Sequence, residues 1–414
     1  MRRIFPLLCC ILLLEGCDLL KTHDPFGRTR AAVETRPAGS SGGRQEGGEP
    51  EVRRTLWASG VDFPSGYDWQ RDTAYGSVDA HLILFRDGAP VVTVQTGERW
   101  HVSTDTDMHR IAGGHLYTDY SSADATWIGR DGTELFHYEG REMMAGFLVR
   151  DDGIWTLGLD RADGQGLSLR RDGKVVFEDP DGLLPPGADN PAFPGGLLHE
   201  DEGALYFFYY KTDGSGQQWF QVRDGKPESL ALEKEISAVF DIRRLNGRNI
   251  IVSEKKSWGL IGLLFRGDEP IVMHIDGGSK IRWAWLTGID GADYFIKGEL
   301  YASQSSRPSL WRADGSLLGI GWNEKIIDSQ ANTDHAAWIH ANSKGAAISY
   351  TLDGEPIRLE MPCRYVTPRC SLLQGKHFLL ALTPLDRNLP PYVLHNGQRQ
   401  DYHLNGFLTG LAYE

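Results

Sequence analysis

The chain has 414 residues, with 43 Lys and Arg against 56 Asp and Glu, so its formal net charge is −13. This acidic balance disfavours nucleic acid and anionic membrane surfaces as partners. The 49 glycines and the 10% aromatic content suit many tight turns between aromatic-rich strands, so we expect an all-β protein.

The N-terminus has the pattern of a lipoprotein export signal. Two arginines precede an apolar stretch over 4–14 that is too short to cross a bilayer. Gly16 before Cys17 resembles the lipobox of bacterial lipoproteins, although Glu15 departs from the small or apolar residue usual there. We predict a signal peptide over 1–16, lipidation of Cys17 and an exported protein anchored in the outer membrane, on its periplasmic or cell-surface side. The alternative is an ordinary signal peptide with Cys17 discarded or unpaired.

The segment after the cysteine has the composition of a linker. Up to residue 53 it is dominated by Gly, Ser, Glu and Arg and has no apolar periodicity. The sequence therefore predicts a flexible tether over 17–53 and a single folded domain over 54–414.

A turn with glycine at its centre recurs eight times in that domain. Successive turn glycines lie between 39 and 52 residues apart, which is the spacing of a propeller with several strands in each repeat. A strand that usually carries a central aromatic residue precedes each turn. The glycines are Gly88, Gly132, Gly173, Gly225, Gly267, Gly315, Gly354 and Gly397, and the strand centres are Trp57, Tyr117, Trp155, Tyr206, Ile251, Tyr294, Trp338 and Phe378.

Each repeat predicts four antiparallel strands that cannot bury both faces alone. Stacking such sheets radially covers the faces, and a ring leaves few exposed edges. The domain opens on the aromatic strand "TLWASG" and ends on "LNGFLTGLAYE", which is similar to the short strand "MAGFLVRDDG". We therefore predict a β-propeller of eight four-stranded blades, with seven as the alternative, closed by the C-terminal strand completing the first blade.

These repeats resemble those of uncharacterised β-propeller lipoproteins of anaerobic Gram-negative gut bacteria. There too an aromatic strand leads into a "vw-kdG" turn, and the resemblance covers all eight repeats of this chain. It implies export and a propeller, and it carries over no catalytic residue.

A ligand site is expected among the long connections, because tight turns leave one face of a propeller plain. The connection over 61–80 combines aromatic residues with carboxylates and an arginine, a set that suits sugar rings and their hydroxyl groups. The alternative for Trp69 is a side chain that folds down as a plug beneath the loop. The candidate ligand-binding residues are Tyr67, Asp68, Trp69, Arg71 and Tyr75.

Two pairs of acidic residues have the spacing of fragments of a calcium loop. Asp105 and Asp107 form one pair, and Asp179 and Asp181 form the other. Neither pair has the complete run that ends in a bidentate Glu, so these residues are only weak calcium candidates and are more often turn formers. Apart from calcium we expect no cofactor.

The two remaining cysteines, Cys363 and Cys370, lie close together in "CRYVTPRC". An exported protein permits disulfides, so we predict a bridge that closes this short loop, with two free buried thiols as the alternative.

The functional expectation is a binding module whose long-loop face takes a glycan or a partner protein. The chain has no His-Glu-x-x-His, Cys-x-x-Cys or phosphate-binding loop. The first alternative is a glycan-cleaving enzyme, a hydrolase or lyase, with acidic residues converging at the mouth of the ring. The second is a structural scaffold of an outer-membrane assembly.

Overall fold

The structure is a computed structural model, and within several of its strands only the backbone is described. The chain divides after residue 52, and the described residues belong to the second unit, Arg53–Glu414. Within them, no helix is long and apolar enough to span a membrane. The described ranges are 54–69, 78–96, 110–121, 124–140, 142–160, 166–185, 197–214, 216–232, 236–255, 261–273, 280–290, 293–302, 305–320, 325–331, 336–341, 348–352, 355–359, 363–364, 371–374 and 377–414.

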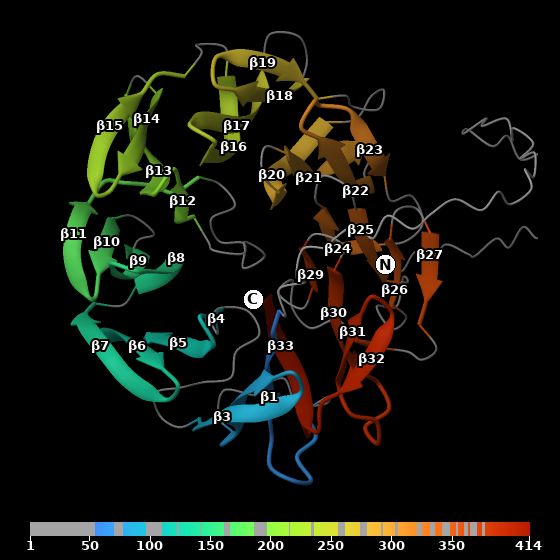
Figure 1. Cartoon of the computed structure of the whole chain (residues 1–414). Helices are drawn as coiled ribbons and strands as arrows, with labels where there is room; N and C mark the ends of the chain where they lie inside the picture. Colours follow the sequence, from blue (N-terminus) through green and yellow to red (C-terminus); the bar gives the residue numbers. More distant parts are fainter. Residues whose placement is uncertain are drawn as a thin grey trace, which may run out of the picture. The chain divides into compact units, whose positions relative to one another are not determined.

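The described strands of this unit form eight antiparallel sheets arranged as the blades of a propeller (Figure 1). In each blade the strands lie side by side from the centre of the ring to its periphery, and we number them first to fourth in that order. Blade 1 contains β33 (Gly406–Tyr413), β1 (Leu56–Asp62), β2 (His81–Arg86) and β3 (Ala89–Gln95). Blade 2 contains β4 (Arg110–Ala112), β5 (His115–Ser121), β6 (Ala125–Arg130) and β7 (Thr133–Glu139). Blade 3 contains β8 (Glu142–Arg150), β9 (Gly153–Asp160), β10 (Leu167–Arg171) and β11 (Lys174–Asp179). Blade 4 contains β12 (His199–Asp201), β13 (Ala204–Asp213), β14 (Gly216–Arg223) and β15 (Lys226–Leu230).

The other four blades follow the same order along the chain. Blade 5 contains β16 (Ile236–Leu245), β17 (Arg248–Lys255), β18 (Ile261–Arg266) and β19 (Glu269–Val272). Blade 6 contains β20 (Lys280–Asp290), β21 (Asp293–Ala302), β22 (Ser305–Arg312) and β23 (Leu317–Ile320). Blade 7 contains β24 (Lys325–Ala331), β25 (Ala336–Ala341), β26 (Ile348–Leu352) and β27 (Glu355–Arg358). Blade 8 contains β28 (Cys363–Arg364), β29 (Ser371–Gln374), β30 (His377–Pro384), β31 (Tyr392–His395) and β32 (Gln398–Asp401).

The C-terminal strand closes the ring as predicted. It pairs antiparallel with β1, from Leu56 opposite Tyr413 to Asp62 opposite Gly406. The backbone of Thr55 also exchanges two hydrogen bonds with that of Glu414, at 2.5 and 3.1 Å. The prediction of eight blades is therefore confirmed, with one departure: the first strand of blade 8 is divided into β28 and β29, which both pair with β30.

The Asp-Gly turns have the left-handed geometry that their sequence predicts. Asp131 and Gly132 have φ values of 52° and 80°, and Asp172 and Gly173 have 48° and 79°. Two successive residues at positive φ make the type I′ turn, whose twist matches that of the strands it joins. Asp, Asn and Gly tolerate this region better than other residues, which explains why the sequence repeats them here.

The turn aspartate also holds the start of the second strand of its own blade. Asp172 Oδ1 accepts a hydrogen bond from the backbone N–H of Ile154 at 2.9 Å, and the Asp172 N–H donates to the Ile154 carbonyl at 2.8 Å. Asn396 makes the same pair of bonds with Phe378. The repeated turn therefore fastens three strands of a blade together. The same arrangement recurs at Asp87, Asp131 and Asp224.

The turn glycine lies against the blade that precedes it. A Cβ on Gly132 would be 3.1 Å from a methyl group of Val94, and one on Gly225 would be 2.5 Å from a methyl group of Val176. Val94 and Val176 belong to the fourth strands of blades 1 and 3. Glycine is therefore required here twice over, for the positive φ and for the close packing of neighbouring blades.

The arginine before the turn covers the aromatic residue of the second strand. The Arg86 guanidinium carbon is 5.7 Å from the centre of the Trp57 ring, and that of Arg171 is 5.9 Å from Trp155. Arg223 has the same relation to Tyr206. These contacts combine cation–π attraction with shielding of the ring from water.

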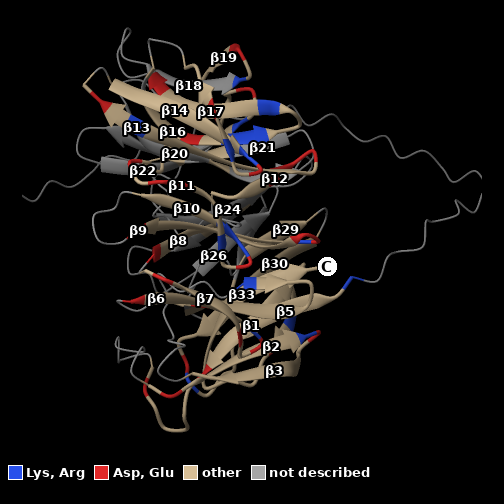
Figure 2. Cartoon of the chain, turned by 90° about the vertical axis from the view of Figure 1, so that its left-hand side faces the viewer, with Lys and Arg blue, Asp and Glu red and all other residues tan. Residues whose placement is uncertain are grey.

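The hydrophobic core is distributed between the blades. Between blades 3 and 4 the buried side chains include Leu157, Leu169, Phe207 and Val222, and the described side chains form similar clusters at six other interfaces. Among the central aromatic residues whose side chains are described, Tyr117, Trp155, Tyr206 and Phe378 are buried, as predicted, and Trp57 packs against the cluster between blades 1 and 2. In the side view, charged residues lie mainly at strand ends and turns (Figure 2).

Candidate functional site

The two faces of the propeller differ in the connections they carry. Consecutive strands are antiparallel, so the connections alternate between the faces. We call the face with the first-to-second and third-to-fourth turns, such as 151–152 and 172–173, the turn face. The opposite face carries the remaining connections, including 63–80 and 180–198, and we call it the loop face.

Polar groups of the turn face are engaged in contacts between blades. Arg150, at the end of β8, donates from Nη2 to the carbonyl of Gly203 in blade 4 at 2.9 Å. Its Nε lies 3.6 Å from Glu200 and 3.5 Å from Asp152, and its Nη1 lies 3.8 Å from Asp224. This cluster joins blades 3 and 4, which gives these charged residues a structural role.

The ends of two other first strands, β12 and β33, are also joined to the next blade by hydrogen bonds. Asp201, at the end of β12, accepts hydrogen bonds from the backbone N–H groups of Asn246 and Gly247 at 2.7 and 2.9 Å. Glu414 follows β33, and its Oε1 accepts from the N–H of Gly113 in blade 2 at 3.1 Å. Backbone groups at the inner edges of the sheets thus find partners in neighbouring blades.

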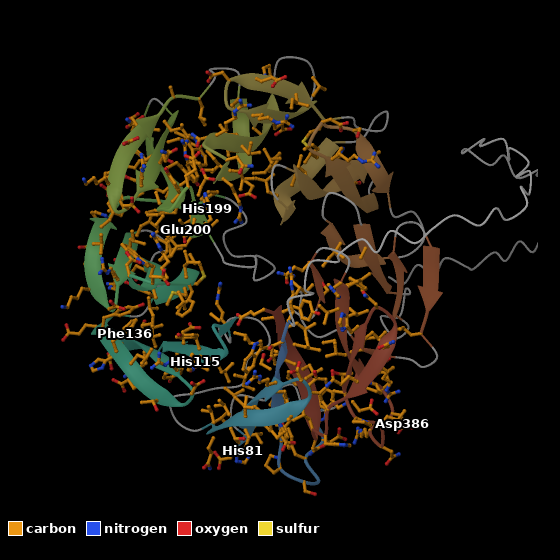
Figure 3. The ribbon with its side chains drawn as sticks, in the orientation of Figure 1. His81, His115, Phe136, His199, Glu200 and Asp386 are labelled. Atoms are coloured by element: carbon orange, nitrogen blue, oxygen red, sulfur yellow. The ribbon has the colours of Figure 1, made fainter. Side chains whose placement is uncertain are left out.

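His199 is a second link between blades 4 and 5. Its ring lies between Tyr206 and Phe208 at the inner rim of blade 4 (Figure 3), and Nε2 accepts a hydrogen bond from the Arg244 N–H at 2.9 Å. Burial, aided by the Arg243 charge, lowers the pKa of His199 to about 3. The imidazole is therefore neutral at physiological pH and serves as a hydrogen-bond acceptor.

A buried ion pair lies between blades 2 and 3. Arg170 Nη1 is 2.5 Å from Glu142 Oε1, and the guanidinium carbon is 4.1 Å from the centre of the Tyr138 ring. Burial raises the pKa of Glu142, although Arg170 opposes this effect. Burial also raises the pKa of the Tyr138 hydroxyl. The cluster joins β7 to β8 and β10 and is enclosed within the interface.

The predicted ligand-binding loop starts with residues that hold it against the propeller. Trp69 is 6% exposed, and its ring centre is 5.3 Å from that of Phe407 on β33. Asp68 Oδ1 lies 2.6 Å from Arg387 Nη2, which belongs to the second-to-third connection of blade 8. Tyr67 is half-buried, with its ring 5.1 Å from Phe63.

These positions correct the prediction for Trp69. Its indole is buried in the interface of blades 1 and 2, as in the loop-plug alternative, so it offers no exposed face to a sugar. Asp68 and Tyr67 remain at the loop face, where Asp68 is partly exposed. Arg71 and Tyr75 lie outside the described residues.

Asp179 has protein partners at both carboxylate oxygens. Oδ2 accepts a hydrogen bond from the Tyr209 hydroxyl at 2.9 Å and lies 2.8 Å from Lys211 Nζ, and Oδ1 accepts from the Asp181 N–H at 3.2 Å. This arrangement agrees with the turn-forming alternative to a calcium loop. Asp105 and Asp107 lie outside the described residues. Among the side chains that the structure describes, no three His, Cys, Asp or Glu are grouped to hold a metal ion.

Cys363 is a free, buried thiol, so the predicted bridge to Cys370 is not present. Its Sγ lies 3.1 Å from the Tyr392 hydroxyl, which keeps the thiol directed into the blade. Burial raises the pKa of Cys363, so the thiol stays protonated. Cys370 itself lies outside the described residues.

Blade 2 carries an aromatic row at its loop-face end that the sequence analysis missed. Tyr120, Trp127 and His137 lie directly opposite one another on β5, β6 and β7. The Tyr120 and Trp127 rings stack with centres 5.5 Å apart and planes inclined by 21°, and the His137 ring is 6.4 Å from Trp127. Counting back from the turn at Asp131 would place Phe136 opposite Trp127. A β-bulge between Ile128 and Gly129 shifts the register by one residue, so the sequence alone carries no signal for the Trp127–His137 pair.

Comparisons with known proteins bear on the fold. No protein-family model matches the chain, and no curated protein matches it. Among solved structures, the chain is similar to the dihydro-heme d1 dehydrogenase NirN in complex with DHE, with 12% identity and a TM-score of 0.51. The alignment covers 86% of this chain and 74% of NirN. The β-propeller domain of the Trilobed protease from Pyrococcus furiosus is 10% identical over 68% of this chain and 86% of that chain, with a TM-score of 0.42. The likeness to NirN shows the β-propeller fold and carries over no activity.

Proposed function

We propose that this chain is an exported, lipid-anchored β-propeller that binds a glycan or a partner protein on its loop face. The turn face is engaged in contacts within and between blades, as Arg150 and Asp201 illustrate. The loop face carries the longer connections, and such connections on a rigid scaffold are where binding residues concentrate.

The observation that carries this proposal is the anchored start of the loop after β1, over 63–69. Trp69 holds it from below through Phe407, and Asp68 ties it to Arg387 in blade 8. The start of this connection is thus tied to the second-to-third connection of blade 8 by contacts within the protein. A pre-organised surface loses less conformational entropy on binding than a mobile one.

A loop exchange tests this proposal. Residues 70–77 are replaced by a Gly-Ser segment of equal length in the otherwise full chain, with Trp69 and Asp68 retained. We expect the exchange to abolish binding to a defined polysaccharide or a purified envelope protein, measured by calorimetry. Lys174→Ala, at an exposed position beside a turn-face turn, is the control and keeps the parent affinity. Equal binding by parent and loop variant would refute the proposal, and release of reducing ends would favour the enzyme alternative.

Export and anchoring form a separate part of the proposal, supported by the basic and apolar N-terminus and by Gly16-Cys17. In cells that express the full chain, labelling with a fatty-acid analogue should mark the parent and leave Cys17→Ala unlabelled. The parent should fractionate with the outer membrane, and protease treatment of intact cells distinguishes the two sides of that membrane. Equal labelling of both proteins would contradict the assignment of Cys17.

A further inference from the structure

We infer that a neutral saccharide binds at the aromatic row of blade 2, formed by Tyr120, Trp127 and His137. The inference rests on the binding function proposed above and names both a ligand class and a site. It replaces buried Trp69 with rings that remain in contact with solvent.

The three rings form one continuous surface across three strands. They occupy directly opposed positions, with spacings of 5.5 and 6.4 Å between successive ring centres. Tyr138, the next residue after His137, points the other way and is buried against Arg170 of blade 3. Because side chains alternate along a strand, the row lies on the face of the sheet directed toward blade 1.

The row differs from the equivalent stack of blade 4 in the exposure of its tyrosine and in its added histidine. Blade 4 has an equivalent stack, in which Tyr209 and Phe220 lie 4.9 Å apart with planes inclined by 16°. There Tyr209 is 2% exposed, because Asp179 of blade 3 accepts its hydroxyl hydrogen bond and Lys211 lies over Phe220. In blade 2 Tyr120 is partly exposed and the side chain of His137 is 58% exposed, while Trp127, like Phe220, is partly buried.

The polar group at the end of the row is suited to a hydroxyl. His137 Nδ1 lies 2.7 Å from Glu134 Oε1, so this nitrogen carries the proton and donates to the carboxylate. In the neutral ring Nε2 is then an acceptor, which a sugar hydroxyl can satisfy. The apolar C–H face of a pyranose matches the surface of the adjoining rings.

The charges around the row select against acidic polymers. Glu134, Asp124 and Glu139 all lie on the strands and connections that border it, and Asp124 and Glu139 are exposed. A uronate or sulfated glycan would meet like charge at each of them. The favoured ligand is therefore an uncharged saccharide.

The backbone beside the row is held in place. The two loop-face connections of blade 2 are short, and the Gly140 N–H donates to the Asp124 carbonyl at 2.9 Å. Thr126 Oγ1 donates to the Gly140 carbonyl at 3.0 Å and fixes the same corner. By contrast, the second-to-third connection of blade 1, over 63–80, and the connection from blade 1 to blade 2, over 96–109, are long. The row thus lies beside short, hydrogen-bonded connections of blade 2, next to longer connections of blade 1.

The test uses the full chain and a panel of neutral soluble polysaccharides, such as β-glucan, xylan and galactomannan, with polygalacturonate as the charged probe. We expect the parent to bind at least one neutral polymer and to bind polygalacturonate more weakly. Trp127→Ala should weaken binding about tenfold, and Trp127→Phe should restore most of the affinity. Phe220→Ala, at the equivalent position of blade 4, is the matched control and should bind as the parent does.

His137→Ala keeps the test decisive if Trp127→Ala does not fold, because this exposed side chain is not needed for packing. We expect about a threefold loss of affinity for the same polymer. Unchanged binding by His137→Ala and Trp127→Ala would overturn the site while leaving the loop-face function intact. A parent that binds no neutral polymer would overturn the saccharide assignment, and the loop exchange against a protein partner would then decide the broader proposal separately.

Discussion

The turn aspartate has two structural tasks that no other residue except asparagine can combine. Asp172 adopts a φ of 48° and also accepts the hydrogen bond from the Ile154 N–H. Asn396 shows that a neutral amide oxygen serves equally well at this position. The recurring Asp-Gly pair is therefore explained by backbone geometry and hydrogen bonding, without any role in catalysis.

Substitution of Asp172 tests these two tasks. Asp172→Asn should leave the urea midpoint nearly unchanged, because the amide oxygen accepts the same bond. Asp172→Ala loses the acceptor and is strained at positive φ, so its free energy of unfolding should fall by about 1–3 kcal/mol. Equal losses in the two variants would show that the carboxylate charge, and not the hydrogen bond, matters.

Turn glycines allow strain and crowding to be separated. Gly203 and Gly225 have φ values of 77° and 81°, but an added Cβ would meet nothing within 4 Å at Gly203 and Val176 at Gly225. Gly203→Ala should therefore cost about 1–2 kcal/mol of unfolding free energy from backbone strain alone. Gly225→Ala should cost more, and chemical denaturation of the two variants measures the difference. Similar losses would contradict the role of close packing between blades.

The lowered pKa of His199 predicts that the folded protein loses stability in acid. Its pKa is about 3 in the folded protein against an ordinary value of 6.5, so the unfolded chain binds the extra proton between these values. Stability is therefore complete above about pH 6.5 and falls as the pH approaches 3, by up to about 1.4 kcal/mol per pH unit. The raised pKa of Glu142 acts in the opposite direction, so the parent alone does not isolate this effect.

The variant His199→Gln isolates it, because the glutamine oxygen can accept the Arg244 bond and does not titrate. Thermal midpoints measured between pH 7 and pH 4 should fall less steeply for the variant than for the parent. Parallel curves would remove His199 as the source of acid sensitivity.

At the level of strands, the ring depends on β33. This strand supplies the first strand of blade 1, and Ser59 Oγ and Thr409 Oγ1 add a buried side-chain hydrogen bond at 2.9 Å. Phe407 and Leu408 are buried in two different inter-blade clusters. Loss of the strand would expose β1 and both clusters.

Deletion of 406–414 should therefore abolish cooperative unfolding or yield aggregated protein. Adding a synthetic peptide of residues 404–414 should restore a cooperative transition, as measured by circular dichroism. Glu414→Gln, which retains the strand, is the control. A truncated protein that unfolds like the parent would contradict the dependence on closure.

Patterns local in sequence predicted the blades, and contacts distant in sequence decided the site. The spacing of the turn glycines predicted all eight sheets, and the likeness of the last segment to an earlier short strand predicted the closing strand. The burial of Trp69 depends on Phe407, which lies at the other end of the chain, so composition of the loop could not reveal it. The partner of Cys363 is likewise Tyr392 on another strand, and the pairing of Trp127 with His137 depends on a β-bulge that the turn sequence does not reveal.

At the scale of the propeller, three first strands are linked to the following blade by contacts that the structure describes. Glu414 reaches Gly113, Arg150 reaches Gly203, and Asp201 reaches Asn246. The residue types differ, but each lies at the end of a first strand and binds the next first-to-second turn. The stability of a blade is therefore coupled to that of its neighbour at these three interfaces.

Thr55 and Glu414, joined by two backbone hydrogen bonds, bring the ends of the propeller body together. A short covalent splice between them would turn the polypeptide into a circle with every strand still beside its own partner. New termini could then be opened in a different blade, so that a cargo fused there would project from another point on the circumference. The position of the natural ends is thus one choice among several compatible with the same ring.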